Sequence, residues 1–237
     1  NVLVVKVNNT QPSSRWYSGS GIYRNVHLTV TEPIHVARYG TFVTTPDLEA
    51  AYAKGKANVN IETKVDNASG ETATVKVKST IYDADGQAVA TVESEEKTVE
   101  HGKETLFEDD TVIDDPVLWD IDNPYRYKLV SEVIVGEDII DTYETKFDVR
   151  YFEFDADEGF SLNGKYMKLH GVSMHHDLGA LGAATNARAV ERQMEIMKDM
   201  GVNAIRVTHN PASPELLEAA NNLGLLVVEE AFDSWNQ

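Results

Sequence analysis

Short apolar runs with period-2 alternation dominate residues 34–147. Asn58–Glu62 and Thr74–Lys78 alternate strictly between polar and apolar side chains, a pattern typical of half-buried β-strands. Turn residues such as Asp83-Ala84-Asp85-Gly86 separate the runs at hairpin spacing. Seven short strands within about 115 residues predict a β-sandwich. These strands are expected at Ile34–Val43, Ala57–Val65, Ala73–Tyr82, Ala88–Val92, Lys103–Val112, Tyr127–Val135 and Ile139–Phe147.

The hydrophobic period changes after residue 149. Asn163-Gly164 favours a hairpin turn, and a strand is expected at Met167–Val172. Asn186 or Thr185 is a candidate N-cap for a helix over Ala187–Met200, where apolar residues recur at helical spacing.

Residues 203–228 read as strand, loop, helix and strand. Asn203–Thr208 is short and apolar, Pro214 suits the first turn of a helix, and Gly224 suits the position after its end. Leu225–Val228 is a continuous apolar run, as expected for a parallel strand buried on both faces. The β-α-β-α-β order indicates a parallel sheet with right-handed crossovers.

The first 31 residues predict two strands, Val2–Val7 and Asn25–Val30, joined by an irregular loop. Arginine and aromatic side chains crowd into this loop, where they suit either sugar stacking or the packing of one domain against the next. They are Arg15, Trp16, Tyr17, Tyr23 and Arg24.

Polar side chains follow each of the three expected parallel strands. Because the carboxyl edge of such strands carries the chemistry in α/β folds, these side chains are candidate site residues. The first strand is followed by His175, His176 and Asp177, the second ends in Arg206 and His209, and the third is followed by Asp233 and Trp235, beyond Glu229 and Glu230.

The histidines after the first two strands also suggest a zinc site, in which folding would supply the later ligands. Adjacent histidines such as His175 and His176 often diverge, however, and the sequence has no His-x-x-x-His pattern. No metal or other cofactor is therefore expected.

Composition narrows the classes of partner. The net charge of −18 argues against nucleic acid and anionic membranes, and no apolar run approaches the length of a transmembrane helix. The absence of cysteine excludes disulfides and thiolate metal sites, but does not fix the compartment. Between Glu93 and Asp115, ten acidic residues face two lysines; a solvated strand face is expected there, rather than a calcium site.

Several motifs resemble glycoside hydrolase family 2, which contains β-galactosidases, β-glucuronidases and β-mannosidases. N-A-I-R-V-T-H-N-P at Asn203–Pro211, followed by N-x-L-G-L-L-V-V, is similar to the first signature of that family, whose members commonly carry tyrosine at the position of Asn210. S-R-W-Y-S-G-S-G-I-Y-R resembles the end of its jelly-roll domain. P-x-L-W-D-x-x-x-P-Y-x-Y at Pro116–Tyr127 resembles its immunoglobulin-like domain, with Trp119 as a packing anchor, and Asp157–Val172 resembles the start of its barrel.

The resemblance implies a multidomain β plus α/β protein. Residues 1–31 are expected to be the tail of a jelly-roll sugar-binding-like domain, 32–148 an immunoglobulin-like β-sandwich, and 149–237 the truncated first part of a (β/α)8 TIM barrel. A jelly-roll tail without its other strands exposes apolar surface, which a second copy of the chain would cover, so a homo-oligomer is considered.

The function implied is that of a retaining exo-β-glycosidase acting on a carbohydrate β-glycoside. β-Galactosidase is favoured because His175–Ala184 is similar to a branch of the family often assigned that activity. A β-glucuronidase parent is the rival enzyme, although no basic clamp for a uronate carboxylate can be located. A non-catalytic carbohydrate-binding or scaffolding module is the alternative class. A nucleotide-binding protein is disfavoured because no glycine-rich phosphate motif follows a strand.

The resemblance also implies roles for the candidate residues. Arg206 would lie near the nucleophile and favour its ionised form, and His209 would line the terminal-sugar subsite. Both catalytic glutamates come from later barrel strands, and the acid/base follows an asparagine. The sequence contains no Asn-Glu pair, so neither glutamate is assigned, and the chain alone is expected to be inactive. The expected substrate-contacting residues are Arg206, His209, Asp233, Trp235, His175, His176 and Asp177.

Overall fold

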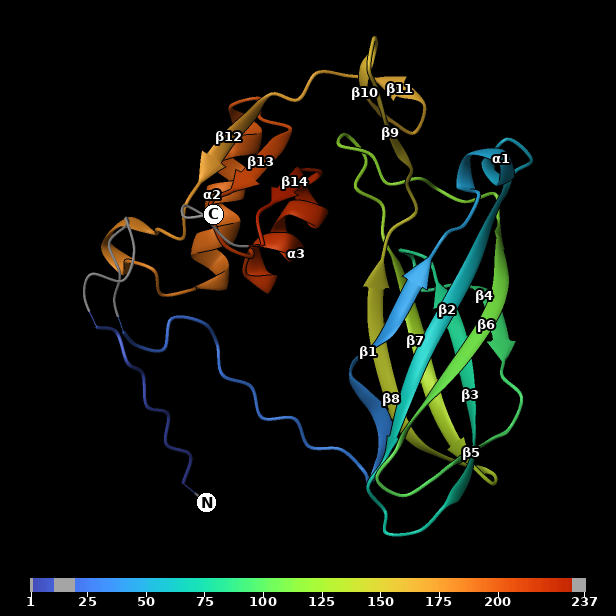
Figure 1. The fold of residues 1–237 in the computed structure, drawn as a ribbon. Coiled ribbons are helices and arrows are strands. Elements are labelled where there is room, and N and C mark those ends of the chain that lie inside the picture. Colours follow the sequence, from blue (N-terminus) through green and yellow to red (C-terminus); the bar gives the residue numbers. More distant parts are fainter. Residues whose placement is uncertain (1, 11–19, 232–237) are drawn as a thin grey trace. The chain divides into compact units, whose positions relative to one another are not determined.

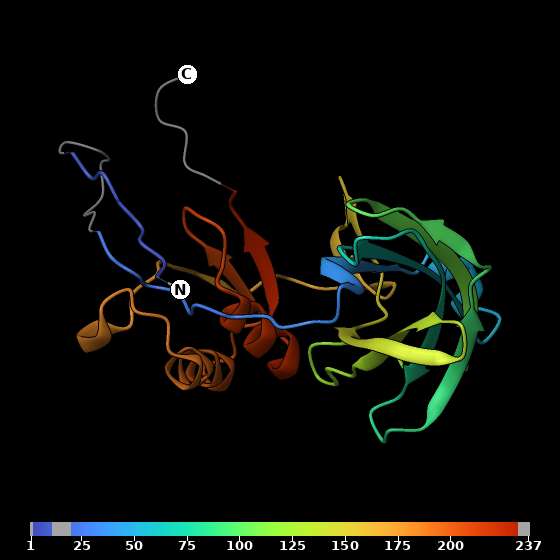
Figure 2. The ribbon, with the colours of Figure 1, turned by 90° about the horizontal axis from the view of Figure 1, so that it is seen from below.

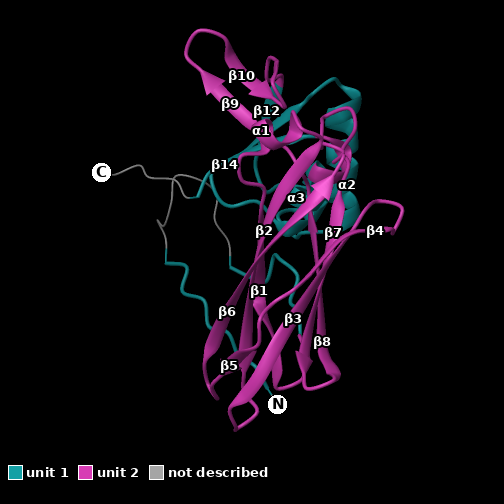
Figure 3. Ribbon diagram, turned by 90° about the vertical axis from the view of Figure 1, so that its right-hand side faces the viewer, with its two compact units in different colours: residues 1–28, 171–220, 225–237 teal, residues 29–170, 221–224 magenta. Residues whose placement is uncertain are grey.

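The computed structural model describes residues 2–10 and 20–231 of the 237-residue chain. These fall into two compact units, shown in Figure 3. The sandwich unit comprises residues 29–170 and 221–224, and the parallel-sheet unit comprises residues 1–28, 171–220 and 225–237. The three-part division at residues 31/32 and 148/149 stays a prediction.

Two antiparallel sheets face each other in the sandwich unit, as Figures 1 and 2 show, so the predicted β-sandwich is confirmed. All seven expected strands are present. One sheet has the order β1 (Ile34–Thr44), β2 (Lys56–Asn67) and β6 (Glu104–Asp114); the other has the order β4 (Ala88–Glu93), β3 (Ala73–Tyr82), β7 (Tyr127–Val135) and β8 (Asp138–Phe147). The sequence did not predict β5 (Lys97–Val99), which pairs with β3, or helix α1 (Leu48–Tyr52), because each is too short to show a period.

The alternating side chains meet between the two sheets. Ile61 of β2, Ile81 of β3 and Leu129 of β7 are buried in one apolar cluster, and Phe107 of β6 is buried in a second. Trp119 is also completely buried, with the guanidinium carbon of Arg150 4.2 Å from its ring centroid, which confirms Trp119 as a packing anchor.

The acidic run is a solvated strand face, as expected. On β6, the carboxylates of Glu104 and Asp114 lie 3.3 and 3.2 Å from the ammonium groups of Lys64 and Lys56 on the neighbouring β2. All four side chains are about half exposed or more, so water and salt screen these charges.

A small three-stranded hairpin sheet follows the sandwich: β9 (Phe152–Asp155), β10 (Gly159–Leu162) and β11 (Lys165–Tyr166). Asn163 and Gly164 both have positive φ, 51° and 74°, as the predicted Asn-Gly turn requires.

The parallel sheet has the order β12 (Gly171–Met174), β13 (Ala204–Val207) and β14 (Leu226–Glu229), with helices α2 (Ala187–Asp199) and α3 (Pro214–Leu223) and a short 3-10 turn, η1 (Gly179–Leu181). Both helices cover the same face of the sheet (Figure 2). The predicted N-cap is confirmed, since the Asn186 side chain accepts a hydrogen bond from Ala189 N at 3.0 Å. Gly224 adopts the predicted left-handed conformation after α3. None of the described helices is long and apolar enough to cross a membrane.

Four strand predictions were wrong. The strand expected at Met167–Val172 begins only at Gly171, where pairing with Ala204 starts. Val228 is 50% exposed, so the last strand is not buried on both faces; β14 lies at the end of the described sheet. Val2–Val7 and Asn25–Val30 form no strands, because no described segment pairs with them.

Candidate active site

The parallel register brings the loops after β12, β13 and β14 to one edge of the sheet. Met174 pairs with Val207, and Val207 pairs with Glu229, so the three strands end together. The backbone N–H and the hydroxyl of Thr208 both donate to the Met174 carbonyl oxygen, at 2.9 and 3.1 Å. These bonds fix the start of the β13 loop, whose Thr208–His209 peptide bond is cis, against the end of β12.

One carboxylate joins two of the candidate residues at this edge. Oε2 of Glu230 lies 2.6 Å from Nδ1 of His209, and Oε1 forms an ion pair with Nη2 of Arg206. The hydrogen bond from His209, reinforced by that from Arg206 and by their charges, lowers the pKa of Glu230 below its ordinary value. Glu230 is therefore an anion at neutral pH.

The ionised carboxylate fixes the role of one nitrogen of His209. Because an ionised carboxylate only accepts, Nδ1 of His209 must donate to Glu230. The His175 ring stands edge-on to His209, with centroids 5.4 Å apart and planes at 80°. The structure thus brings together Arg206, His209 and His175 of the expected set, and adds Glu230.

Glu230 is the residue whose role the sequence did not reveal. It was visible only as one of two adjacent glutamates at a strand end. The structure separates them: Oε1 of Glu229 accepts from the Ala212 backbone N–H at 2.7 Å, whereas Glu230 takes the two basic side chains.

The other residues of the β12 loop have different surroundings. Asp177 anchors its own loop by accepting from the Gly179 N–H at 2.8 Å. Burial, and then the nearby charge of Arg24, lower the pKa of His176, although a hydrogen bond with the Asn210 backbone opposes the shift. His176 is therefore neutral at pH 7.

Residues before the sandwich also pack against these loops. Arg24 Nη2 donates to the Pro211 carbonyl oxygen at 2.5 Å, and the Thr185 N–H donates to the Tyr23 carbonyl oxygen at 2.7 Å. Of the two interpretations of the aromatic and arginine segment, the contacts of Tyr23 and Arg24 are those of packing. Arg15, Trp16 and Tyr17 lie outside the described residues.

The expected contacts at Asp233 and Trp235 also lie outside the described residues. Across residues 2–10 and 20–231, no three His, Cys, Asp or Glu side chains are arranged to hold a metal ion. Within the described residues, the site consists of the carboxylate of Glu230, the guanidinium of Arg206 and the imidazole rings of His209 and His175.

Comparison with known proteins identifies the family of this chain. The sequence model of Glycosyl hydrolases family 2 matches residues 34–150, and that of Glycosyl hydrolases family 2, TIM barrel domain, matches residues 155–234. The chain belongs to glycosyl hydrolase family 2. The resemblance drawn from its motifs is thereby confirmed, and so is the fold class of an immunoglobulin-like sandwich followed by the start of a barrel.

Relatives of known name include Beta-galactosidase BoGH2A of Bacteroides ovatus, which is 48% identical over all of this chain and 27% of its own length. A putative beta-glucuronidase of Formosa agariphila is 32% identical over all of this chain and 22% of its own length. A solved family 2 structure from Bacteroides cellulosilyticus is 42% identical, with a TM-score of 0.86 over 93% of this chain and 28% of that one. The chain thus spans about a quarter of the length of these relatives.

Proposed function

We propose that the full-length protein containing this chain is a retaining exo-β-glycosidase, with β-galactosidase as its favoured specificity. The single observation that carries the proposal is the cluster of Arg206, Glu230, His209 and His175 at the carboxyl edge of β12–β14, in a chain of family 2. Barrel enzymes assemble their active sites at this edge.

Each member of the cluster has a role in the proposal. Arg206 supplies a permanent positive charge that would favour the ionised form of a nearby nucleophile. The imidazole of His209 lines the terminal-sugar subsite, and Glu230 holds the side chains of Arg206 and His209 in place. His175, His176, Asp177, Asp233 and Trp235 complete the proposed contacts with the sugar.

The choice of sugar rests on the relatives. The 48% identical relative is named a β-galactosidase, which supports that specificity. The 32% identical relative is named a putative β-glucuronidase, so glucuronide hydrolysis is the second candidate.

The test is to assay the full-length protein with nitrophenyl β-galactoside and nitrophenyl β-glucuronide. We expect the galactoside to give the higher kcat/KM, and His209→Ala to lower it by roughly 10- to 100-fold, the loss of one hydrogen bond to a charged or ionisable group. His101→Ala, in a turn of the sandwich, is the matched control. Faster turnover of the glucuronide would assign the rival activity, and no turnover of either would favour a non-catalytic module.

The 237-residue chain assayed by itself is expected to be inactive, because it contains no Asn-Glu pair. Turnover by pure chain of verified mass would contradict this. Self-association of the chain is a further part of the proposal, which light scattering would test by comparing the mass in solution with 26.3 kDa.

A further inference from the structure

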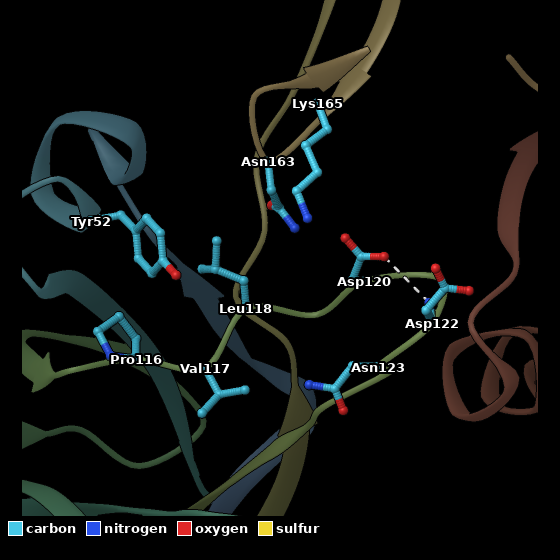
Figure 4. A pocket seen from close by; sticks show the side chains of 9 residues that line it. All are labelled: Tyr52, Pro116, Val117, Leu118, Asp120, Asp122, Asn123, Asn163 and Lys165. Atoms are coloured by element: carbon cyan, nitrogen blue, oxygen red, sulfur yellow. Dashed lines mark hydrogen bonds between the residues drawn. The ribbon is translucent and has the colours of Figure 1, made fainter. Parts of the chain in front are cut away.

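The sandwich unit contains an open cavity of about 530 Å³ that has no part in the proposed active site. It lies between helix α1, the segment 116–123 and the β10–β11 turn (Figure 4). Its volume falls within the range of small-molecule sites. The residues that line it are Tyr52, Pro116, Val117, Leu118, Asp120, Asp122, Asn123, Asn163 and Lys165.

The walls of this cavity are tied to one another. Asn163 Nδ2 donates to the Trp119 carbonyl oxygen at 2.9 Å, and its Oδ1 accepts from the Tyr151 N–H at 3.1 Å. The Asp120 N–H donates to the Asn123 carbonyl oxygen at 2.9 Å, which closes the adjoining loop. The hairpin and the loop are thus fixed before any ligand arrives, which reduces the entropy lost on binding.

Several polar groups around the cavity are left for a ligand. Within the described part of the chain, the side chains of Asp122, Asn123 and Lys165 make no hydrogen bond or ion pair. One oxygen of Asp120 accepts from the Asp122 N–H at 3.3 Å, and nothing described occupies the other. The cavity therefore offers carboxylate acceptors beside amide and ammonium donors.

An apolar surface accompanies these polar groups. Tyr52, 42% exposed, lies across the cavity from Asp120 and Asp122, with Leu118 between them (Figure 4). Val117 extends this surface. Aromatic and aliphatic side chains of this kind pack against the C–H face of a sugar ring, while polar neighbours bond its hydroxyls.

The lining of the cavity presents both signs of charge to a ligand. An anion would meet the carboxylates of Asp120 and Asp122, and a cation would meet the ammonium of Lys165. A neutral polyhydroxylated ring can use all three, because each hydroxyl both donates and accepts. We infer that this cavity is a second carbohydrate site, which binds one neutral pyranoside unit without cleaving it.

The test is a nuclear magnetic resonance titration of the 237-residue chain with methyl β-galactoside, followed through its backbone amide signals. The inference predicts saturable shifts confined to residues 117–123 and 163–165 and to Tyr52. Because no turnover is measured, the result does not depend on the proposed glycosidase activity. Shifts confined to residues 206–209 instead would report the proposed active site and would overturn a second one.

Two variants and one control complete the design. Tyr52→Ala and Asp122→Asn are each expected to weaken binding about tenfold, through lost ring contact and a lost charged acceptor. Asp138→Asn makes the same charge change at the start of β8, outside the lining of the cavity, and should bind as the parent does. The parent-like amide spectrum of each variant checks its fold.

Charged probes provide the decisive comparison. Inorganic phosphate and putrescine, titrated separately, should shift the lining amides less than the methyl galactoside does at equal concentration. Tighter binding of either ion would show a charge-selective site and overturn the inference. Sugar shifts that survive both variants unchanged would overturn it as well.

Discussion

The face formed by β2 and β6 and the carboxyl edge of β12–β14 use similar residues in different ways. On the face, Glu104 and Asp114 each pair with one lysine, as in Lys64–Glu104 at 3.3 Å, where both side chains are about half exposed. At the edge, a single carboxylate, Glu230, takes both Arg206 and His209 and is 22% exposed. Charged side chains on the strand face thus lie apart and in contact with water, whereas those at the ends of the parallel strands lie close together.

This difference separates stability from function. Exposed ion pairs contribute about 0–1 kcal/mol, so the stability of the sandwich comes from the apolar side chains between its sheets. The cluster at the strand edge consists of charged and polar side chains. Substitutions in the sandwich core should therefore change stability, and substitutions at the edge should change activity.

The largest expected effect comes from the sandwich core. Phe107→Ala removes a completely buried ring and leaves a cavity, which should lower the free energy of unfolding by about 3–5 kcal/mol. Phe42→Ala, at a position 60% exposed on β1, should cost less than about 1 kcal/mol. Urea unfolding followed by tryptophan fluorescence measures both. Equal losses would show that burial does not govern this unit.

The next effect concerns the strand edge. Glu230→Gln in the full-length protein should lower kcat/KM about tenfold at neutral pH, because a neutral amide holds Arg206 and His209 less firmly. The unfolding free energy serves as the second measurement and should change much less than in Phe107→Ala. Glu191→Gln, which removes a carboxylate paired with Arg188 on α2, is the matched control.

The pH profile distinguishes positioning by Glu230 from a merely structural role. The pKa of Glu230 lies below its ordinary value of 4.5, so its charge and its contacts persist above pH 4.5 and are lost as the pH falls through the lowered pKa. The ratio of parent to Glu230→Gln activity should be constant above pH 4.5 and fall below it. A ratio that stays constant as the pH falls below 4.5 would contradict the positioning role.

A smaller effect is expected at the N-terminus of α2, where the sequence predicted a capping residue. Asn186→Ala removes the side-chain oxygen that accepts from Ala189 N, and should destabilise the parallel-sheet unit by about 1 kcal/mol. Asn58→Ala, at an exposed position on β2, is the control. No change on removing Asn186 would mean that solvent caps this helix equally well.

Local signals were sufficient wherever the neighbouring structure lies close in sequence. The alternation of β2 and β3, the Asn163-Gly164 turn and the Asn186 cap were all predicted correctly, because each depends on residues only a few positions away. The strands expected at Val2–Val7 and Asn25–Val30 were wrong because strands also need partners, which a local pattern does not supply.

In the candidate site, too, some features could be predicted from the sequence and others could not. Strand ends identified Arg206, His209 and His175 as neighbours, because parallel register follows from the β-α-β order. The choice between Glu229 and Glu230 did not follow, since adjacent residues at a strand end point in different directions. Only the structure shows that Glu229 binds the Ala212 backbone, while Glu230 binds the side chains of Arg206 and His209.

The smallest expected effect is at the loops beside the cluster. The pKa of His176 is lowered chiefly by burial and secondly by Arg24. Arg24→Met removes the second cause, so the pKa of His176 should rise but remain below 6.5. A titration of the His176 ring carbon-bound proton by nuclear magnetic resonance measures the change directly, and Arg188→Met on α2 should leave it unmoved.

The same change has a consequence for stability. A histidine whose pKa is lowered by folding takes up protons more readily in the unfolded chain, so its contribution is lost as the pH falls below 6.5. Arg24→Met should make this acid-side loss shallower, because the remaining shift is smaller. An unchanged His176 titration in Arg24→Met would show that the Arg24 charge does not reach this loop. Arg24 would then act on the loops at the strand edge through its hydrogen bond to the Pro211 carbonyl oxygen and not through its charge.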